Sequence, residues 1–195
     1  MTMDDEALDR LVEAARNGDP EAFGALFDRY HAPVYRYVVA RVGRPSDAED
    51  LAQLVFVKAL EALPRYEARG VPFGGWLFRL ARNVVIDHIR TRREHSTLDL
   101  IVERSTPESG PDELAVLRQE MDSVAASLRR LTPEQREAIE LRFFAGLSAK
   151  EAAVAMGRQE GTVRGLQFRA IAAIRRDLDI ETDQDELPRV SGTTR

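Results

Sequence analysis

Apolar residues recur at intervals of three and four along most of this 195-residue chain. One series comprises Phe23, Leu26, Phe27, Tyr30, Val34, Tyr37 and Val38. A second comprises Leu114, Leu117, Met121, Val124, Leu128 and Leu131. This spacing gathers the apolar side chains on one side of an α-helix, whereas a half-buried strand would alternate every second residue. No convincing alternating segment occurs in the sequence, which therefore predicts an all-α fold.

Helix starts are marked by residues whose side chains can accept a hydrogen bond from the first helical turn. Four such signals are Asp19 before Pro20, Ser46 with Glu49, Thr132 with Gln135, and Ser148 with Glu151. The last three have the spacing of a capping box, in which the two side chains bond each other's backbone amides. A further helix is expected from Trp76 to about Arg93, after a loop over residues 65–73 that contains Gly70 and Pro72.

The helical pattern fails between Ser96 and Pro111, where serine, threonine, proline and glycine stand among acidic residues. Such a composition is typical of a flexible linker. The sequence therefore predicts two small helical domains, residues 1–95 and 112–178, joined by a linker at 96–111. Residues 179–195 are acidic and polar and are expected to form a disordered tail.

Composition excludes several classes of protein. The chain has no cysteine, so disulfides, thiolate nucleophiles and cysteine-ligated zinc are absent. No apolar run approaches the roughly 18 residues of a membrane span, and the acidic start MTMDDE does not resemble a signal peptide. A cytoplasmic location without membrane insertion is expected. The net charge of −5 argues mildly against a nucleic-acid partner, but residues 73–95 carry +3 and residues 129–176 carry +5. Such basic blocks suit phosphate binding, although solvated helix faces are also charged.

Residues 148–167 have the spacing of a helix-turn-helix. A short helix over 149–156 is broken by Gly157, and a second helix begins near Glu160–Thr162. Ala153 lets the second helix approach, Gly157 makes the turn and Val163 anchors the second helix. That helix presents arginines, which suit guanine edges and phosphates. The alternative is an αα-hairpin with exposed arginines.

The helix beginning at Trp76 is the other candidate nucleic-acid surface. Arg79, Asn83 and Arg90 fall on one face with Asp87 beside them, and an amide can both donate to and accept from a base. Aromatic residues near a basic groove can stack on unpaired bases. The candidates are Tyr66, Phe73, Trp76 and Phe78, although a lone tryptophan is more often a core residue.

Three segments in order resemble a bacterial RNA polymerase sigma factor of the sigma-70 family, in its extracytoplasmic-function (ECF) group. Residues 46–53, SDAEDLAQ, are similar to the family's polymerase-clamp helix. Residues 73–83, FGGWLFRLARN, are similar to the helix that engages the minus-ten promoter element. Residues 131–142, LTPEQREAIELR, and the helix-turn-helix are similar to the region that reads the minus-thirty-five element.

The resemblance implies a transcription initiation factor that binds core RNA polymerase and promoter DNA and is controlled by an anti-sigma factor. It implies no enzymatic activity, catalytic residue, cofactor, metal or small-molecule substrate, since catalysis belongs to the polymerase. The implied core-polymerase-binding residues are Asp47, Glu49, Asp50 and Gln53. The implied minus-ten residues are Arg65, Tyr66, Arg69, Phe73, Arg79, Asn83, Asp87 and Arg90, and the loop before the Trp76 helix would capture a flipped base. The implied minus-thirty-five residues are Arg158, Thr162, Arg164, Gln167, Phe168 and Arg169.

The sequence departs from the family at three places. Leu54 stands where relatives commonly have glutamate, which removes a candidate charged contact with polymerase. Gly165 and Leu166 stand where many relatives place serine and arginine, so the minus-thirty-five sequence does not carry over. The acidic residues 177–195 extend beyond the usual end.

Two other classes of protein remain as alternatives. A conventional helix-turn-helix regulator, such as a response-regulator output domain with a helical partner, would explain residues 129–176 but not 46–90. A hydrolase is a more remote alternative, because the three histidines are scattered and Asp47, Glu49 and Asp50 spread around a helix start.

Overall fold

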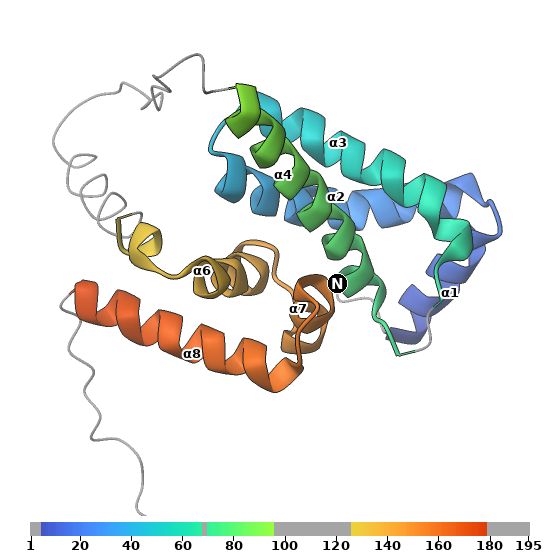
Figure 1. Cartoon of the computed structure of the whole chain (residues 1–195). Helices are drawn as coiled ribbons and strands as arrows, with labels where there is room; N and C mark the ends of the chain where they lie inside the picture. Colours follow the sequence, from blue (N-terminus) through green and yellow to red (C-terminus); the bar gives the residue numbers. More distant parts are fainter. Residues whose placement is uncertain (1–4, 68–69, 96–125, 179–195) are drawn as a thin grey trace, which may run out of the picture.

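The computed structural model describes residues 5–67, 70–95 and 126–178, and this part of the chain is helical with no strand. The first unit contains α1 (Asp5–Arg16), α2 (Pro20–Val42), α3 (Pro45–Ala62), the 3-10 turn η1 (Leu63–Arg65) and α4 (Phe73–His95). The second contains α6 (Pro133–Ile139), the π-helical turn η2 (Glu140–Phe144), α7 (Ala149–Met156) and α8 (Glu160–Asp177) (Figure 1). The all-α prediction is confirmed. The predicted linker and tail lie outside the described residues.

Three of the four predicted helix starts are confirmed. Asp19 caps α2 by accepting from two backbone amides, while Thr132 and Ser148 each complete a capping box at α6 and α7. The prediction for Ser46 is wrong. Helix α3 begins at Pro45, whose fixed φ suits the first helical position, so Ser46 lies inside the first turn and Arg44 caps without a side-chain bond.

The core of the first unit is built from the apolar faces of α2, α3 and α4. Val34, Tyr37 and Val38 of α2 face Val55 of α3 and Phe78 of α4, and each is almost completely buried. The Tyr37 and Phe78 rings meet edge to face with centroids 5.7 Å apart. Burial of the Tyr37 hydroxyl raises its pKa well above the usual range. This packing fixes the position of α4 against α2 and α3.

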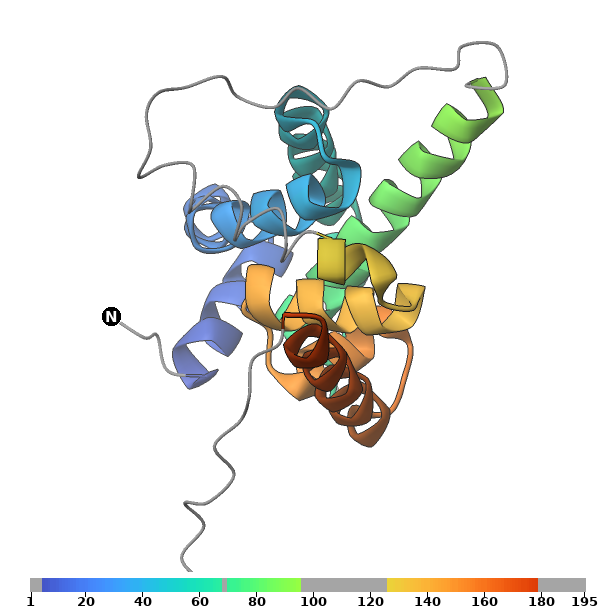
Figure 2. The ribbon, with the colours of Figure 1, turned by 90° about the vertical axis from the view of Figure 1, so that its left-hand side faces the viewer.

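The second unit packs directly on the first. Residues Leu141 and Val163 belong to the same continuous apolar cluster as Val34 and Leu77, while Leu131, Ile139 and Ala170 form a smaller cluster of their own. Helix α7 lies against the N-terminal half of α4, and η2 lies against α2 (Figure 1). Figure 2 shows the contact from the side, with α4 extending beyond it. Among residues 5–67, 70–95 and 126–178, no helix is long and apolar enough to cross a membrane.

Candidate nucleic-acid interfaces

One face of α4 is exposed and polar. It carries Arg79, Asn83, Asp87 and Arg90, the residues that the sequence placed together. Their steps of four and three residues align them along the helix, and Arg90 lies 3.7 Å from the Asp87 carboxylate. Leu77, Ala81 and Val84 face inward and are buried, as expected from the sequence. The arrangement offers cations and an amide to a partner while the opposite side anchors the helix.

The aromatic residues before and within the start of α4 form a buried cluster. The Tyr66 ring contacts Phe73 and Trp76 at centroid distances of 5.8 and 5.0 Å, and Tyr30 joins through Phe73. The Tyr66 hydroxyl donates to the Val71 carbonyl at 2.6 Å, and burial raises the pKa of Tyr66 to about 12. The core interpretation of Trp76 is confirmed.

The aromatic side chains that the sequence suggested for base stacking are buried. Tyr66, Phe73, Trp76 and Phe78 are each less than 8% exposed, so none presents an open ring to an unpaired base in this structure. Tyr66, Phe73 and Trp76 instead pack against one another beside the loop, whereas Phe78 packs against Tyr37 in the core. Tyr30, which the sequence reasoning did not include, belongs to the same cluster. Arg65 is exposed, and Arg69 lies outside the described residues.

The predicted helix-turn-helix is formed by α7, Gly157 and α8. Gly157 has φ +63°, the left-handed conformation that favours glycine, and its amide caps α7. Ala153 and Val163 are buried at the contact between the two helices, as predicted. Helix α8 turns its other side to solvent and exposes Thr162, Arg164, Phe168 and Arg169.

Hydrogen bonds and ion pairs orient several of the polar side chains at and near α8. Phe168 is 75% exposed, so its ring is available to a partner. The Gln167 side-chain oxygen accepts from Arg142 Nε at 2.9 Å. Arg164 pairs with Glu160 one turn earlier at 2.6 Å, and Arg158 pairs with Glu134 of α6. The face therefore combines oriented cations with one exposed aromatic ring.

Helix α3 presents a third exposed face. Glu49, Asp50 and Gln53 are exposed as expected for a docking surface. Asp47 differs, because its carboxylate accepts from Arg92 at 3.1 Å and lies 3.8 Å from His88 Nε2, which ties α3 to α4. Three apolar residues continue the exposed face: Leu54, Val57 and Leu60. Helical periodicity could have revealed them, since they alternate with the buried positions of the same helix.

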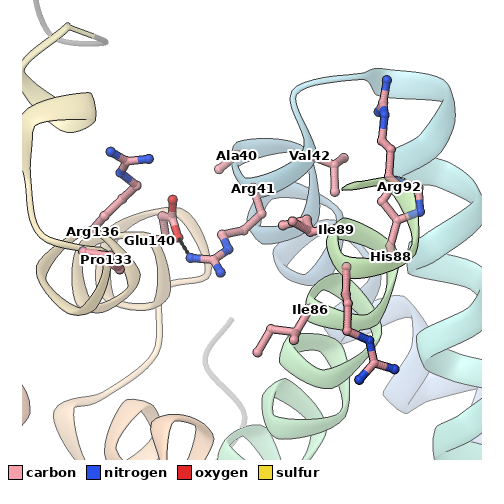
Figure 3. A pocket seen from close by; sticks show the side chains of 11 residues that line it. Ala40, Arg41, Val42, Ile86, His88, Ile89, Arg92, Pro133, Arg136 and Glu140 are labelled. Carbon is pink, nitrogen blue, oxygen red and sulfur yellow. Dashed lines mark hydrogen bonds and ion pairs between the residues drawn. The ribbon is translucent and has the colours of Figure 1, made fainter. Parts of the chain in front are cut away.

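Two ion pairs join the units. Arg82 of α4 donates to Glu137 at 2.6 Å, and Arg41 of α2 donates to Glu140 at 3.0 Å. Both carboxylates are buried, and burial outweighs the attraction of Arg41 so that the pKa of Glu140 rises to about 7. Figure 3 shows the Arg41–Glu140 pair beside a cavity of about 720 Å³ whose lining includes Arg136 and His88.

These features define a class of protein: a helical bundle with an exposed polar and basic helix face, followed by a helix-turn-helix whose second helix is exposed and basic. Within the described residues no group of three or more histidine, aspartate and glutamate side chains is placed to hold a metal ion. Exposed faces of this kind can bind another protein or recognise a nucleic acid.

Comparison with known proteins identifies the family. The Sigma-70 region 2 model matches residues 26–95, and the Sigma-70 region 4 model matches residues 127–176. Among curated relatives, the ECF RNA polymerase sigma factor BldN of Streptomyces coelicolor is 37% identical over 89% of this chain and 66% of its own length. SigD of Mycobacterium tuberculosis is 35% identical over 91% of this chain and 87% of its own. The chain therefore belongs to the ECF sigma factors, non-enzymatic transcription initiation factors of the sigma-70 family that bind core RNA polymerase and promoters.

Solved structures agree with this assignment. CnrH, in complex with the cytosolic domain of CnrY, superposes with a TM-score of 0.65 at 29% identity over 88% of this chain and 97% of its own. The sigma factor RpoE of Bartonella quintana, in complex with the anti-sigma factor NepR, gives a TM-score of 0.64 at 25% identity over 82% and 98%. The region 2 match also removes the response-regulator alternative, which left the first unit unexplained.

Proposed function

We propose that this sigma factor assigns its three exposed helix faces to three tasks. The α3 face with Asp50 and Gln53 docks on core polymerase, α4 with the preceding loop engages the minus-ten element, and α8 reads the minus-thirty-five element. The observation that supports this division most strongly is that each face is exposed while its opposite side is buried in the core. Residues 1–95 and 112–178 are proposed as the two functional domains, and the cytoplasm as the place of action, where polymerase and promoter are found.

The α3 face is proposed to dock through apolar as well as polar contacts. Leu54 replaces the family's usual glutamate and is 41% exposed, beside Val57 at 53%. Exposed apolar side chains in a row are typical of protein–protein contacts. Asp47 is proposed to act indirectly, because its pairing with Arg92 holds the start of α3 in position. Glu49 remains a candidate polar contact at the rim.

Asn83 is proposed to contact the melted minus-ten strand. It is exposed at the centre of the α4 face, flanked by Arg79 and Asp87, and its amide can donate and accept. A flipped base costs a few kcal/mol of stacking and pairing, which contacts on the protein must offset. Arg65 and Arg90 would attract the backbone phosphates on either side.

The minus-thirty-five face is proposed to combine base and phosphate contacts. Arg164 and Arg169 are exposed on α8, and Phe168 between them can contact a thymine methyl group. Gln167, fixed by Arg142, can read a base edge. Arg158 and Thr162 lie at the start of the helix, where backbone amides could also bind a phosphate of the DNA backbone.

Purified-component transcription tests the proposal. Core polymerase with this chain should start transcripts at discrete sites on genomic DNA, and mapping those starts yields both promoter elements. Asn83→Ala should reduce promoter opening while core binding persists, and Asp28→Ala, at an exposed position of α2 outside the three proposed faces, should behave as wild type. If no discrete transcripts form and the chain fails to co-purify with core, the proposed function is wrong.

Control by an anti-sigma factor is also proposed, since RpoE of Bartonella quintana was solved in complex with the anti-sigma factor NepR. Affinity purification of the chain from its host should recover a protein that blocks transcription in the purified assay. A recovered protein that leaves transcription unchanged would not be the regulator.

A further inference from the structure

Arg142 joins the turn before the helix-turn-helix to the exposed helix α8. It lies in the π-helical turn η2 and is half-buried. Its guanidinium donates from Nε to the Gln167 side-chain oxygen at 2.9 Å, and from Nη1 to the backbone carbonyl of Leu147. Leu147 comes directly before Ser148, the N-cap of α7. One arginine side chain therefore ties Gln167 of α8 to the turn that leads into α7.

The turn that carries Arg142 is itself well held. The Leu147 amide donates to the Leu141 carbonyl at 3.0 Å, and both leucines are buried. Between them, Gly146 takes φ +72°, the left-handed conformation that glycine adopts without strain. A guanidinium is planar, so bonding two acceptors at once fixes its orientation. Arg142 is therefore a donor of fixed position and direction beside α8.

The bond to Arg142 determines which way the Gln167 amide points. A guanidinium carries donors and no acceptor, so only the amide oxygen can face it. The amide nitrogen, with its two hydrogens, is then the group left for a partner, and no hydrogen bond to it occurs between described residues. Gln167 is half-exposed and follows Arg164 by three residues, which places it at the edge of the exposed face of α8.

An amide held in this way distinguishes between purines. A freely rotating glutamine can read adenine with two bonds, accepting from N6 and donating to N7. In this structure the oxygen already accepts from a cation, and an adenine amino group would have to approach beside the positive charge of Arg142. Guanine presents two acceptors in the major groove, N7 and O6, and suits a group that offers only hydrogens. The arrangement therefore favours guanine over adenine.

A second arginine of the same unit provides an internal comparison. Arg136 of α6 donates to the backbone carbonyls of Leu128 at 2.9 Å and Arg129 at 2.6 Å. Both acceptors belong to the segment before α6 and neither to α8. Arg136 thus supports the unit through backbone carbonyls, as Arg142 does at Leu147, but these bonds orient no α8 side chain. A purely structural role for Arg142 predicts that the two arginines behave alike.

We propose that Arg142 is a positioning residue for minus-thirty-five recognition. It holds the oxygen of Gln167, so that the amide offers only hydrogens to the DNA and selects guanine at the base pair that Gln167 meets. Arg142 does this without touching the base. The inference rests on the proposed function, in which α8 reads the minus-thirty-five element.

The test is transcription by core polymerase and the full chain on a promoter library randomised over the minus-thirty-five element. Gln167→Ala should flatten the preference at one base pair, which identifies the pair that Gln167 meets. Wild type should prefer G·C to A·T there by at least about fivefold. Arg142→Met should bring adenine close to guanine at that pair, since the released amide can rotate and read either purine. Preferences at the other pairs should not change.

Gln167→Glu tests the same mechanism in a chain that keeps the bond to Arg142. The carboxylate accepts from the guanidinium but has no hydrogen to offer, so the preference should move from guanine to cytosine, whose N4 amino group donates. Arg136→Met is the matched control. It removes an arginine that supports the same unit, and it should leave the base preferences as in wild type.

Four results would overturn the proposal. Gln167→Ala could leave every base preference unchanged, or wild type could prefer an A·T pair where Gln167→Ala flattens the preference. Arg142→Met could keep the wild-type preference at that pair. Finally, Arg136→Met could relax the same pair to the same extent, which would make the role of Arg142 structural only.

Urea unfolding of the full chain tests the pair without polymerase or DNA. The double variant Arg142→Met with Gln167→Ala should lose less stability than the two single variants added together, because both remove the same bond. Additive losses would mean that the bond does not form, and the proposal would fail while discrete transcription persists. Coupled losses with no discrete transcripts from wild type would instead refute the proposed function.

Discussion

Glu140 provides a direct test of how burial and ion pairing compete in the interface between the units. Its carboxylate is almost fully buried and lies 3.0 Å from Arg41. Burial disfavours the charged form, whereas Arg41 and the nearby Arg136 favour it and Glu137 opposes it. Burial prevails and raises the pKa from 4.5 to about 7. This shift corresponds to about 3 kcal/mol of differential stability between the two protonation states.

The direction of the pH dependence follows from that raised pKa. The folded chain binds the Glu140 proton more tightly than the unfolded chain, so protonation stabilises the fold. The contribution is complete below pH 4.5 and is lost as the pH rises to about 7. Other carboxylates titrate over part of this range. Glutamine has nearly the same shape as glutamate but does not ionise. Comparing wild type with Glu140→Gln therefore isolates the contribution of this carboxyl group.

The measurement is urea unfolding at intervals from pH 4.5 to pH 8, for wild type and Glu140→Gln. We expect the stability of wild type relative to the variant to fall by about 3 kcal/mol between pH 4.5 and 7 and then to level off. Carbon-13 NMR of the glutamate carboxyls, with the variant for assignment, should show a carboxyl titrating near 7. Arg41→Met should move that titration to higher pH. A difference that rises with pH would refute the reasoning, because it would mean that the Arg41 pair outweighs burial.

Three other outcomes follow from the structure. Ser148→Ala removes the capping box of α7 and should cost about 1 kcal/mol in urea unfolding, whereas Ser46→Ala, inside the first turn of α3, should cost less than about 0.5 kcal/mol. Phe78→Ala leaves a cavity at the centre of the first unit and should lower the free energy of unfolding by about 3–5 kcal/mol, so helicity should be lost at a lower temperature on heating. Phe168→Ala removes an exposed ring and should change stability by less than about 0.5 kcal/mol, yet weaken minus-thirty-five duplex binding in a fluorescence titration; unchanged binding would exclude Phe168 from that interface.

Local signals in the sequence were sufficient to predict most of the secondary structure. Apolar spacing located the helices, and Thr132, Ser148 and Gly157 gave their ends, because caps and glycine turns depend on neighbours within a few residues. The same local logic failed at Ser46. Two start signals lie side by side there, and the rigid ring of Pro45 determined the first helical residue.

The site could be predicted less completely, because its missing parts depend on contacts between distant segments. The exposed face of α4 follows from periodicity alone. The pairing of Asp47 with Arg92 spans 45 residues, and the Tyr66 ring packs on Phe73, which in turn contacts Tyr30 of another helix. Nothing in the local pattern distinguishes an aromatic residue that awaits a base from one that supports a loop.

The charge pattern of the chain has a different meaning once the interface between the units is known. Residues 129–176 carry a net charge of +5, although two of their carboxylates, Glu137 and Glu140, are paired with arginines of the first unit. Both carboxylates are buried in the interface between the units, whereas Arg164 and Arg169 of α8 are exposed. The exposed surface of this segment is therefore more basic than its net charge indicates, and it is this surface that a DNA backbone would meet.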